Sequence, residues 1–170
     1  ISVRLGNGNG TFAAAATLSL PANSYPVSSP VLVDLDGDND LDIVLANASG
    51  NTISVRLGNG DGSFATAATL SLPGGSGPYS SPVLADLDGD DDLDIVLANF
   101  LGNTISVRLG NGNGSFAAAA TISLPASTNP YSSPVLADLD GDDDLDIVLS
   151  NYSSQTISVR PGNGNRTFAA

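Results

Sequence analysis

Aspartates recur at fixed spacing in three short segments of this 170-residue sequence. Segments 34–42, 86–94 and 138–146 each carry Asp at positions one, three, five, seven and nine, with Gly at position four. Calcium takes six to eight oxygen ligands in flexible geometry, and Asp at alternate positions of a tight loop can direct several carboxylates at one centre. The spacing therefore predicts three calcium sites, one in each segment.

Electrostatics also favour a bound cation in each segment. Two like charges about 4 Å apart repel by roughly 1 kcal/mol in water, and by more near a protein surface. Magnesium fits less well, because it demands near-octahedral geometry and keeps its waters. An EF-hand fits poorly too, because its twelfth position should be Glu and its flanks helical. The twelfth positions here are Leu45, Leu97 and Leu149, between strand-like flanks.

The remaining composition excludes most catalytic chemistry. The sequence has no Cys, Met, Trp, His, Lys or Glu, so Ser-His, Cys-His and Lys nucleophiles and the usual zinc sites cannot be built. An Asp pair could act as acid and base, but every Asp cluster is explained by the cation sites. The net charge of −13 argues against nucleic-acid and anionic-membrane partners, and no apolar run is long enough to span a bilayer. We therefore expect a protein that is not an enzyme.

The elements that position these segments repeat with a period of 52 residues. The phrase ISVR begins at residues 1, 53, 105 and 157, and the Asp segments keep the same spacing. The array 1–170 therefore divides into copies 1–52, 53–104 and 105–156 and a partial copy 157–170. A period of about 50 residues is typical of propeller blades and related arrays.

Each period predicts four short strands. In the second blade, Val83 to Ala85 enters the Asp segment and Asp94 to Ala98 leaves it, both rich in branched apolar residues. Thr104 to Leu109 alternates, which predicts a half-exposed strand with Ser106 and Arg108 facing solvent. A turn of Gly and Asn follows, and then Phe116 to Leu124 as the fourth strand, although its alanines also suit a helix.

The predicted fold is all-β, with repeated four-stranded antiparallel blades of β-propeller type. About three blades are expected, and the complete ones span roughly 30–72 and 82–124. Propellers close with four to eight blades, so three need further blades or other chains to close a ring, or they form an open array. The leucines at position eight of the Asp segments are expected to anchor them to the core: Leu41, Leu93 and Leu145.

The phrases DLDGDxDLDIVLxN and ISVRLGNGxGxF closely resemble the FG-GAP/VCBS repeats of bacterial surface proteins, relatives of the integrin α-subunit propeller. The resemblance covers essentially the whole chain and implies calcium in the hairpin between the first two strands of a blade. It implies these side-chain ligands: Asp34, Asp36, Asp38, Asp42, Asp86, Asp88, Asp90, Asp94, Asp138, Asp140, Asp142 and Asp146. By analogy with position seven of an EF-hand, the backbone carbonyls of Asp40, Asp92 and Asp144 are expected to join them.

One position departs from the family pattern. The family usually has Gly at position six of the loop, where this sequence has Asn39, Asp91 and Asp143. Next to Gly, Asn and Asp are the residues that best tolerate a left-handed backbone. The site is therefore expected to be retained, with a turn of slightly higher conformational energy.

The expected function is that of a non-catalytic, calcium-binding module of a secreted or cell-surface protein, used for adhesion or recognition. One alternative is a structural subunit of an extracellular filament or oligomer, whose partners are other copies of the repeat. Another is a lectin, because Tyr79 and Tyr131 lie in the connectors between periods, although the first copy has Val27 there. The expected partners are therefore calcium, further repeats, and glycans or surface proteins.

Five asparagines lie in N-x-Ser/Thr triplets, which are acceptors for N-glycosylation in secreted proteins. Triplets of this kind also arise by chance in a chain so rich in Asn, Gly, Ser and Thr. The candidate glycosylation sites are Asn9, Asn47, Asn113, Asn151 and Asn165.

Overall fold

The structure is a computed structural model that describes residues 1–164 and 167–169. Within these residues every regular element is a β-strand. The strands are β1 (Ser2–Val3), β2 (Ala16–Thr17), β3 (Val31–Val33), β4 (Asp42–Asn47), β5 (Thr52–Arg56), β6 (Ala68–Ser71), β7 (Val83–Ala85), β8 (Asp94–Asn99), β9 (Thr104–Arg108), β10 (Ala120–Ser123), β11 (Val135–Ala137), β12 (Asp146–Asn151) and β13 (Thr156–Arg160).

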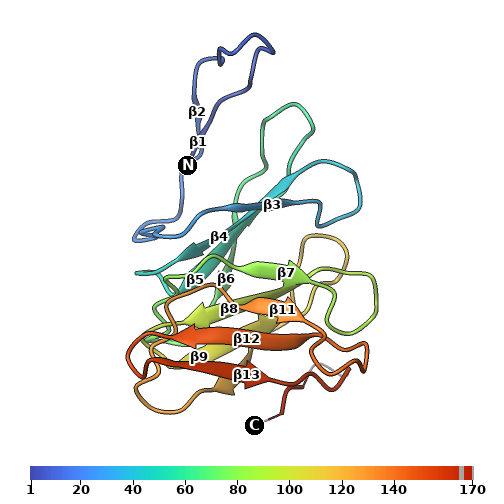
Figure 1. Cartoon of the computed structure of the whole chain (residues 1–170). Coiled ribbons are helices and arrows are strands. Elements are labelled where there is room, and N and C mark those ends of the chain that lie inside the picture. The colour runs from blue at the N-terminus through green and yellow to red at the C-terminus, as the bar shows by residue number, and fades with distance from the viewer. Residues whose placement is uncertain (165–166, 170) are drawn as a thin grey trace.

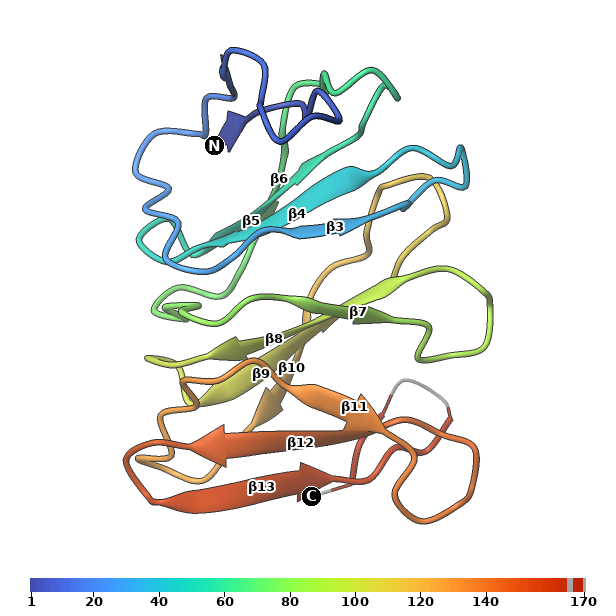
Figure 2. The same cartoon turned by 45° about the horizontal axis from the view of Figure 1, so that its top comes forward.

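The strands form antiparallel sheets in chain order. Blade 1 is the four-stranded sheet β3-β4-β5-β6, blade 2 is β7-β8-β9-β10, and blade 3 is the three-stranded sheet β11-β12-β13. Within the described part of the chain, strands β1 and β2 pair only with each other. Blades 1, 2 and 3 lie one above another (Figures 1 and 2), and the described residues do not close a ring. The predicted all-β array of propeller-type blades is therefore confirmed.

The fourth strand of each blade is shorter than predicted. In blade 2 only Ala120–Ser123 joins the ladder, and Phe116 forms an isolated bridge with Gly110. Ala120 pairs with Val107, so three residues oppose two between the bridge and the ladder. This extra residue is a β-bulge, which leaves part of the strand unpaired and increases its twist. The prediction of a continuous strand from Phe116 to Leu124 was wrong for this reason.

The third strand is not half-exposed as predicted. Ser106 and Arg108 of β9 are only 1% and 7% exposed, because neighbouring blades cover both faces of the sheet. The Arg108 guanidinium donates to the carbonyl of Ala117 (2.7 Å) at the bulge and to the carbonyl of Ser71 in blade 1. Arg56 makes the equivalent contacts with Ala65 and Ser19. Through backbone carbonyls, Arg108 therefore links blade 2 to blade 1, and Arg56 links blade 1 to the segment after β2.

Two apolar clusters hold the blades together. The first inter-blade cluster joins blades 1 and 2, with the buried residues Leu35, Val44, Ala46, Ile53, Val55, Leu72, Ile95 and Leu97. The second joins blades 2 and 3, with Val96, Ala98, Ile105, Val107, Leu124, Ile147 and Leu149. Each blade therefore buries its sheet mainly against its neighbours in the chain, as in other repeat arrays.

Candidate metal centres

The three Asp segments form the loops between the first and second strands of blades 1, 2 and 3. They lie on one edge of the stack, on the right in Figures 1 and 2. The Gly-rich turns between the third and fourth strands share this edge, because Gly58 N–H donates to Asp42 Oδ1 at 2.7 Å and Gly110 N–H donates to Asp94 Oδ1 at 2.8 Å. We call this side of the array the loop edge.

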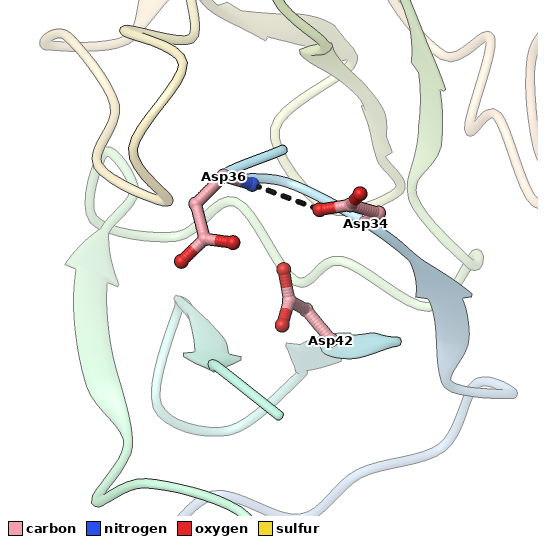
Figure 3. Close-up of side chains that lie close together, drawn as sticks. All are labelled: Asp34, Asp36 and Asp42. Carbon is pink, nitrogen blue, oxygen red and sulfur yellow. Dashed lines mark hydrogen bonds between the residues drawn. The ribbon is translucent and has the colours of Figure 1, made fainter. Parts of the chain in front are cut away.

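Carboxylates meet in every loop. In blade 1, Asp34, Asp36 and Asp42 each offer an oxygen, and these oxygens lie within 4.8 Å of one another. Figure 3 shows the three carboxylates around a common space, with Asp36 N–H directed at Asp34 Oδ1. The matching groups are Asp86, Asp88 and Asp90 in blade 2 and Asp138, Asp140 and Asp146 in blade 3. Three Asp clusters, one in each repeat, could thus hold a metal ion.

The clusters contain part of the predicted ligand set. Positions one, three and nine meet in blades 1 and 3, and positions one, three and five meet in blade 2. Three predicted side-chain ligands lie outside these clusters: Asp38, Asp94 and Asp142. Asp94 is nevertheless close enough to Asp88 and Asp90 for their charges to raise its pKa, after the larger effect of burial.

The first Asp of each loop organises the backbone. Asp34 accepts hydrogen bonds from the N–H groups of Gly37 (2.8 Å) and Asn39 (2.9 Å). Desolvation alone would raise its pKa, but the bonds from Asn39 and Gly37 hold the pKa of Asp34 below its ordinary value. Asp86 and Asp138 accept the same bonds in their loops. These bonds therefore favour the ionised form of this carboxylate and set its orientation in the loop.

Position six adopts the left-handed backbone expected there. The φ angles of Asn39, Asp91 and Asp143 are 70°, 68° and 69°. Asn and Asp tolerate this region better than other residues with a side chain. The departure from Gly at position six therefore leaves the loop geometry intact.

The ninth position is a buried connection between the loop and the Gly-rich turn. Asp94 is fully buried, and its carboxylate accepts from Leu87 N–H (2.9 Å) and Gly110 N–H (2.8 Å). Burial raises the pKa of Asp94, and the bonds from Gly110 and Leu87 oppose that rise. Asp42 and Asp146 repeat both contacts. This residue thus has a structural task that the sequence pattern did not reveal.

The seventh position lies against the Gly-rich turn. A Cβ added at Gly112 would lie 2.4 Å from Asp92 Oδ1, and the same close approach joins Gly60 to Asp40 and Gly164 to Asp144. Desolvation, followed by the charges of Asp90 and Asp86, raises the pKa of Asp92. The side chain of position seven thus packs on the turn, and the role of its backbone carbonyl as a ligand stays a prediction.

The donor set fits a hard cation. Asp36 Oδ1 is buried and accepts no hydrogen bond from any of the described residues, although it lies among other carboxylates. Desolvation, followed by the charges of Asp38 and Asp42, raises the pKa of Asp36. A buried acceptor without a partner is costly, and a cation beside it would remove both this cost and the repulsion. Only oxygen ligands are offered, which is the set that calcium prefers.

The leucines that anchor the loops differ from the prediction. Leu93 packs against the first inter-blade cluster and Leu145 is half-buried, but Leu41 is 57% exposed. Leu35, at position two, is buried in the cluster instead. Position two faces the following blade and position eight the preceding one, and only β1 and β2 precede blade 1. The anchoring role predicted for Leu41 was therefore wrong.

Gly110, in the Gly-rich turn of blade 2, lies so close to the Asp loop that a side chain there would clash with it. This predicts a mutational effect. A Cβ at Gly110 would lie 2.5 Å from the backbone oxygen of Leu93. We expect Gly110→Ala to destabilise the protein by about 1–3 kcal/mol, the usual cost of overpacking, in chemical denaturation. Gly74→Ala is the matched control, because a Cβ there meets nothing within 4 Å. Equal stability of the two variants would contradict the close packing of loop and turn.

The candidate glycosylation sites fall into two groups. Asn47 and Asn151 are buried, and each Nδ2 donates to two hydroxyls, those of Thr52 and Ser54 in the case of Asn47. Burial argues against modification of these two residues in the folded protein. Asn9 and Asn113 are exposed in Gly-rich turns, where glycosylation stays a prediction. Asn165 lies outside the described residues.

Comparison with solved structures supports the fold. A chain of the Tc holotoxin pore of Photorhabdus luminescens is similar, with a TM-score of 0.59 and 22% sequence identity. The match covers 98% of this chain and 8% of that chain, so this chain spans a small part of the toxin subunit. Among the described residues no helix has the length and hydropathy to cross a membrane. The search against curated proteins found no match.

A family model matches nearly the whole length of the sequence. The model describes an FG-GAP-like repeat and matches residues 1–45, 34–97 and 86–149. These matches span each of the three Asp loops and the strands beside them. The resemblance seen in the sequence is thereby confirmed, and the chain belongs to the FG-GAP-like repeat family.

Proposed function

We propose that this chain is a non-catalytic, calcium-binding repeat module of a larger secreted or cell-surface protein, used for adhesion or recognition. The observation that carries the calcium assignment is the threefold carboxylate cluster, with the buried and unpartnered Asp36 Oδ1 in blade 1. The family membership and the small share of the toxin subunit that the chain matches support a module of a larger protein.

Each loop would hold its calcium with side chains from positions one, three, five and nine. In blade 1 these are Asp34, Asp36, Asp38 and Asp42, with the carbonyl of Asp40 as a further ligand. Bound calcium would neutralise carboxylates that otherwise repel one another across the loop. The ion therefore has a structural task, which is to fix the loop edge of each blade.

The composition supports the non-catalytic part of the proposal. His, Cys, Lys and Glu are absent, and every Asp except Asp61 belongs to one of the three loops. The ligand chemistry also suits an extracellular setting, where weak calcium sites with dissociation constants of about 10⁻⁴–10⁻³ M are filled.

The proposal predicts a calcium stoichiometry of three per chain, measured by isothermal titration calorimetry on metal-free protein. Asp88→Asn should lower the stoichiometry to two, because it removes one carboxylate charge from the blade 2 cluster. Asp61→Asn is the matched control, because the other copies carry Asn9 and Asn113 at that place. No calcium uptake at millimolar concentration would contradict the proposed function.

A structural subunit of a filament or oligomer is the second candidate, and the outer face of blade 3 favours it. Leu139, Ile157 and Val159 are 55%, 69% and 47% exposed there. The equivalents of the last two in blade 2, Ile105 and Val107, are buried against blade 3 in the second inter-blade cluster. The face therefore has the chemistry of a surface that packs on a further blade.

This candidate predicts association that depends on the outer face. Sedimentation velocity in calcium should show oligomers that grow with protein concentration, and Ile157→Asp should shift them to monomer because it puts a charge in the contact. Leu101→Asp is the control, since Leu101 is also exposed (56%) but lies in a β8–β9 turn away from this face. A wild-type monomer at high concentration would exclude this candidate.

A further inference from the structure

Differences among the three copies concentrate on the edge opposite the loop edge. The copies are nearly identical in their Asp loops and strands, whereas most differing positions lie in two kinds of segment. These are the connectors 21–29, 73–81 and 125–133 and the turns 47–52, 99–104 and 151–156, which we call the connector edge. Variable loops on an unvarying scaffold are the usual place for recognition.

The segments of the connector edge contain no charged side chains. None of its segments contains Asp or Arg, although the chain has 18 acidic residues and a net charge of −13. All the Asp residues lie in the loops and the Gly-rich turn of the opposite edge. The residues that fill the connector edge are mainly Tyr, Ser, Thr, Asn, Gly and Pro, with a few apolar residues such as Phe100 and Leu101. It therefore offers hydroxyls, amides and aromatic rings, and no partner for an ionic group.

Hydrogen bonds fix these segments within and across blades. Phe100 N–H donates to the carbonyl of Gly77 (3.1 Å), which joins the turn of blade 2 to its connector. Asn103 Oδ1 accepts from the N–H of Asn129 (2.7 Å) in the connector to blade 3. Tyr152 N–H donates back to the carbonyl of Asn129 at 3.2 Å. The connector edge is thus one ordered surface, and order before binding reduces the entropy cost of recognition.

Four aromatic rings form a ladder on this edge, across blades 2 and 3. The ring of Phe100 contacts those of Tyr79 and Tyr131 edge-on, with both pairs of centroids 5.5 Å apart. Tyr152 continues the ladder at 6.3 Å from Tyr131. Tyr131 and Tyr152 are 58% and 73% exposed, so the inner rings support the outer ones in place. Beside them the hydroxyls of Ser132 and Ser150 share a hydrogen bond of 2.7 Å.

We propose that this aromatic ladder binds a neutral oligosaccharide. A sugar ring presents apolar C–H faces and hydroxyl edges, which match exposed tyrosine rings and the hydroxyls and amides beside them. The absence of charge on the connector edge disfavours sialylated, sulfated or phosphorylated ligands, which need cationic partners. The proposal rests on the proposed recognition function and deepens it by naming the ligand class.

The test is a glycan array that carries neutral, sialylated and sulfated oligosaccharides, probed with the whole chain in calcium, with affinities then measured by calorimetry. Tyr131→Ala and Tyr152→Ala should each weaken binding of the neutral oligosaccharides by about tenfold, because each removes a stacking ring. Tyr131→Phe should retain most of the affinity, which separates stacking from loss of the hydroxyl. Phe12→Ala is the matched control, because Phe12 is an exposed aromatic residue in a Gly-rich turn of the loop edge.

Three results would overturn the inference. The first is no binding of any neutral oligosaccharide by protein that takes up calcium, which would leave the calcium-binding function standing. The second is binding of charged glycans alone. The third is binding that Tyr131→Ala and Tyr152→Ala do not weaken. Glycan binding without calcium uptake would support the ladder and contradict the calcium assignment, so the two failures are distinguishable.

Discussion

Calcium at about one hundred times its dissociation constant is expected to raise the unfolding temperature of this chain by roughly 15–30 °C. Each site filled to that level adds about 2.7 kcal/mol to the free energy of unfolding. A domain of this size gains about 2–4 °C for each kcal/mol. If all three sites lose their calcium in one cooperative unfolding transition, the three contributions add to a shift of roughly 15–30 °C. Differential scanning calorimetry in calcium and in chelator measures this shift.

Variants of position three test whether the shift arises in the loops. The combined substitution of Asp36, Asp88 and Asp140 by Asn should remove most of the calcium-dependent shift, because each loop loses a carboxylate from its cluster. The same variant should be no less stable than the wild type in chelator, since it relieves repulsion. Asp61→Asn should keep the full shift. A wild-type unfolding temperature that is equal in calcium and in chelator would refute the sites.

The second large effect is expected from Asp94→Ala, and it should be present without calcium. The substitution leaves the N–H groups of Leu87 and Gly110 without their buried acceptor. An unsatisfied buried group costs about 1–3 kcal/mol. These two N–H groups are half-buried, so the free energy of unfolding should fall by roughly 2–6 kcal/mol at most, less a small relief of repulsion from Asp88 and Asp90. Urea denaturation in chelator measures this loss.

The comparison that isolates the structural role uses Asp88→Ala, a loop carboxylate on the cation side. In chelator Asp88→Ala should be close to neutral, whereas Asp94→Ala should be strongly destabilising. In calcium both should lose stability, because both are predicted ligands. If Asp94→Ala were as stable as the wild type in chelator, the connection between loop and Gly-rich turn would not contribute to folding.

The repeat and the order of strands could be predicted from the sequence because they depend on local patterns. Branched apolar runs such as Ile95 to Leu97 are buried in blades 1 and 2 and largely buried in blade 3, and the Gly-Asn turns reverse the chain where expected. The fixed period of 52 residues then extended one blade to the whole array. The meeting of Asp34 with Asp36 also followed, since residues so close in a tight loop share one space.

The burial of Arg108 could not be predicted, because it depends on a neighbouring blade. A strand whose apolar and polar residues alternate is predicted to expose its polar face to solvent. The stacking of the blades shows instead that blade 1 covers the polar face of β9. The acceptors of the Arg108 side chain, Ser71 and Ala117, are backbone carbonyls with no signature in residue type. The β-bulge at Ala117 could not be predicted either, because it lies in a run of alanines that gives no signal for a bulge.

The same limit applies to the site and the aromatic ladder. The contact of Asp94 with Gly110 joins residues 16 positions apart, through a carboxylate that the pattern assigned to calcium alone. The ladder of Tyr79, Phe100 and Tyr131 joins two periods, and its first copy has Val27 and Ala48 in place of rings. Both features arise from how one blade sits on the next, which no local pattern encodes.

Leucines from two successive loops pack at one inter-blade cluster, Leu35 from the loop of blade 1 and Leu93 from that of blade 2. An ion that stiffens either loop would therefore also stiffen the junction between the blades. If such junctions carry tension between two anchoring points, the array would be rigid in calcium-rich fluid and compliant where calcium is scarce. The mechanical strength of the parent protein would then follow the ionic composition of its surroundings.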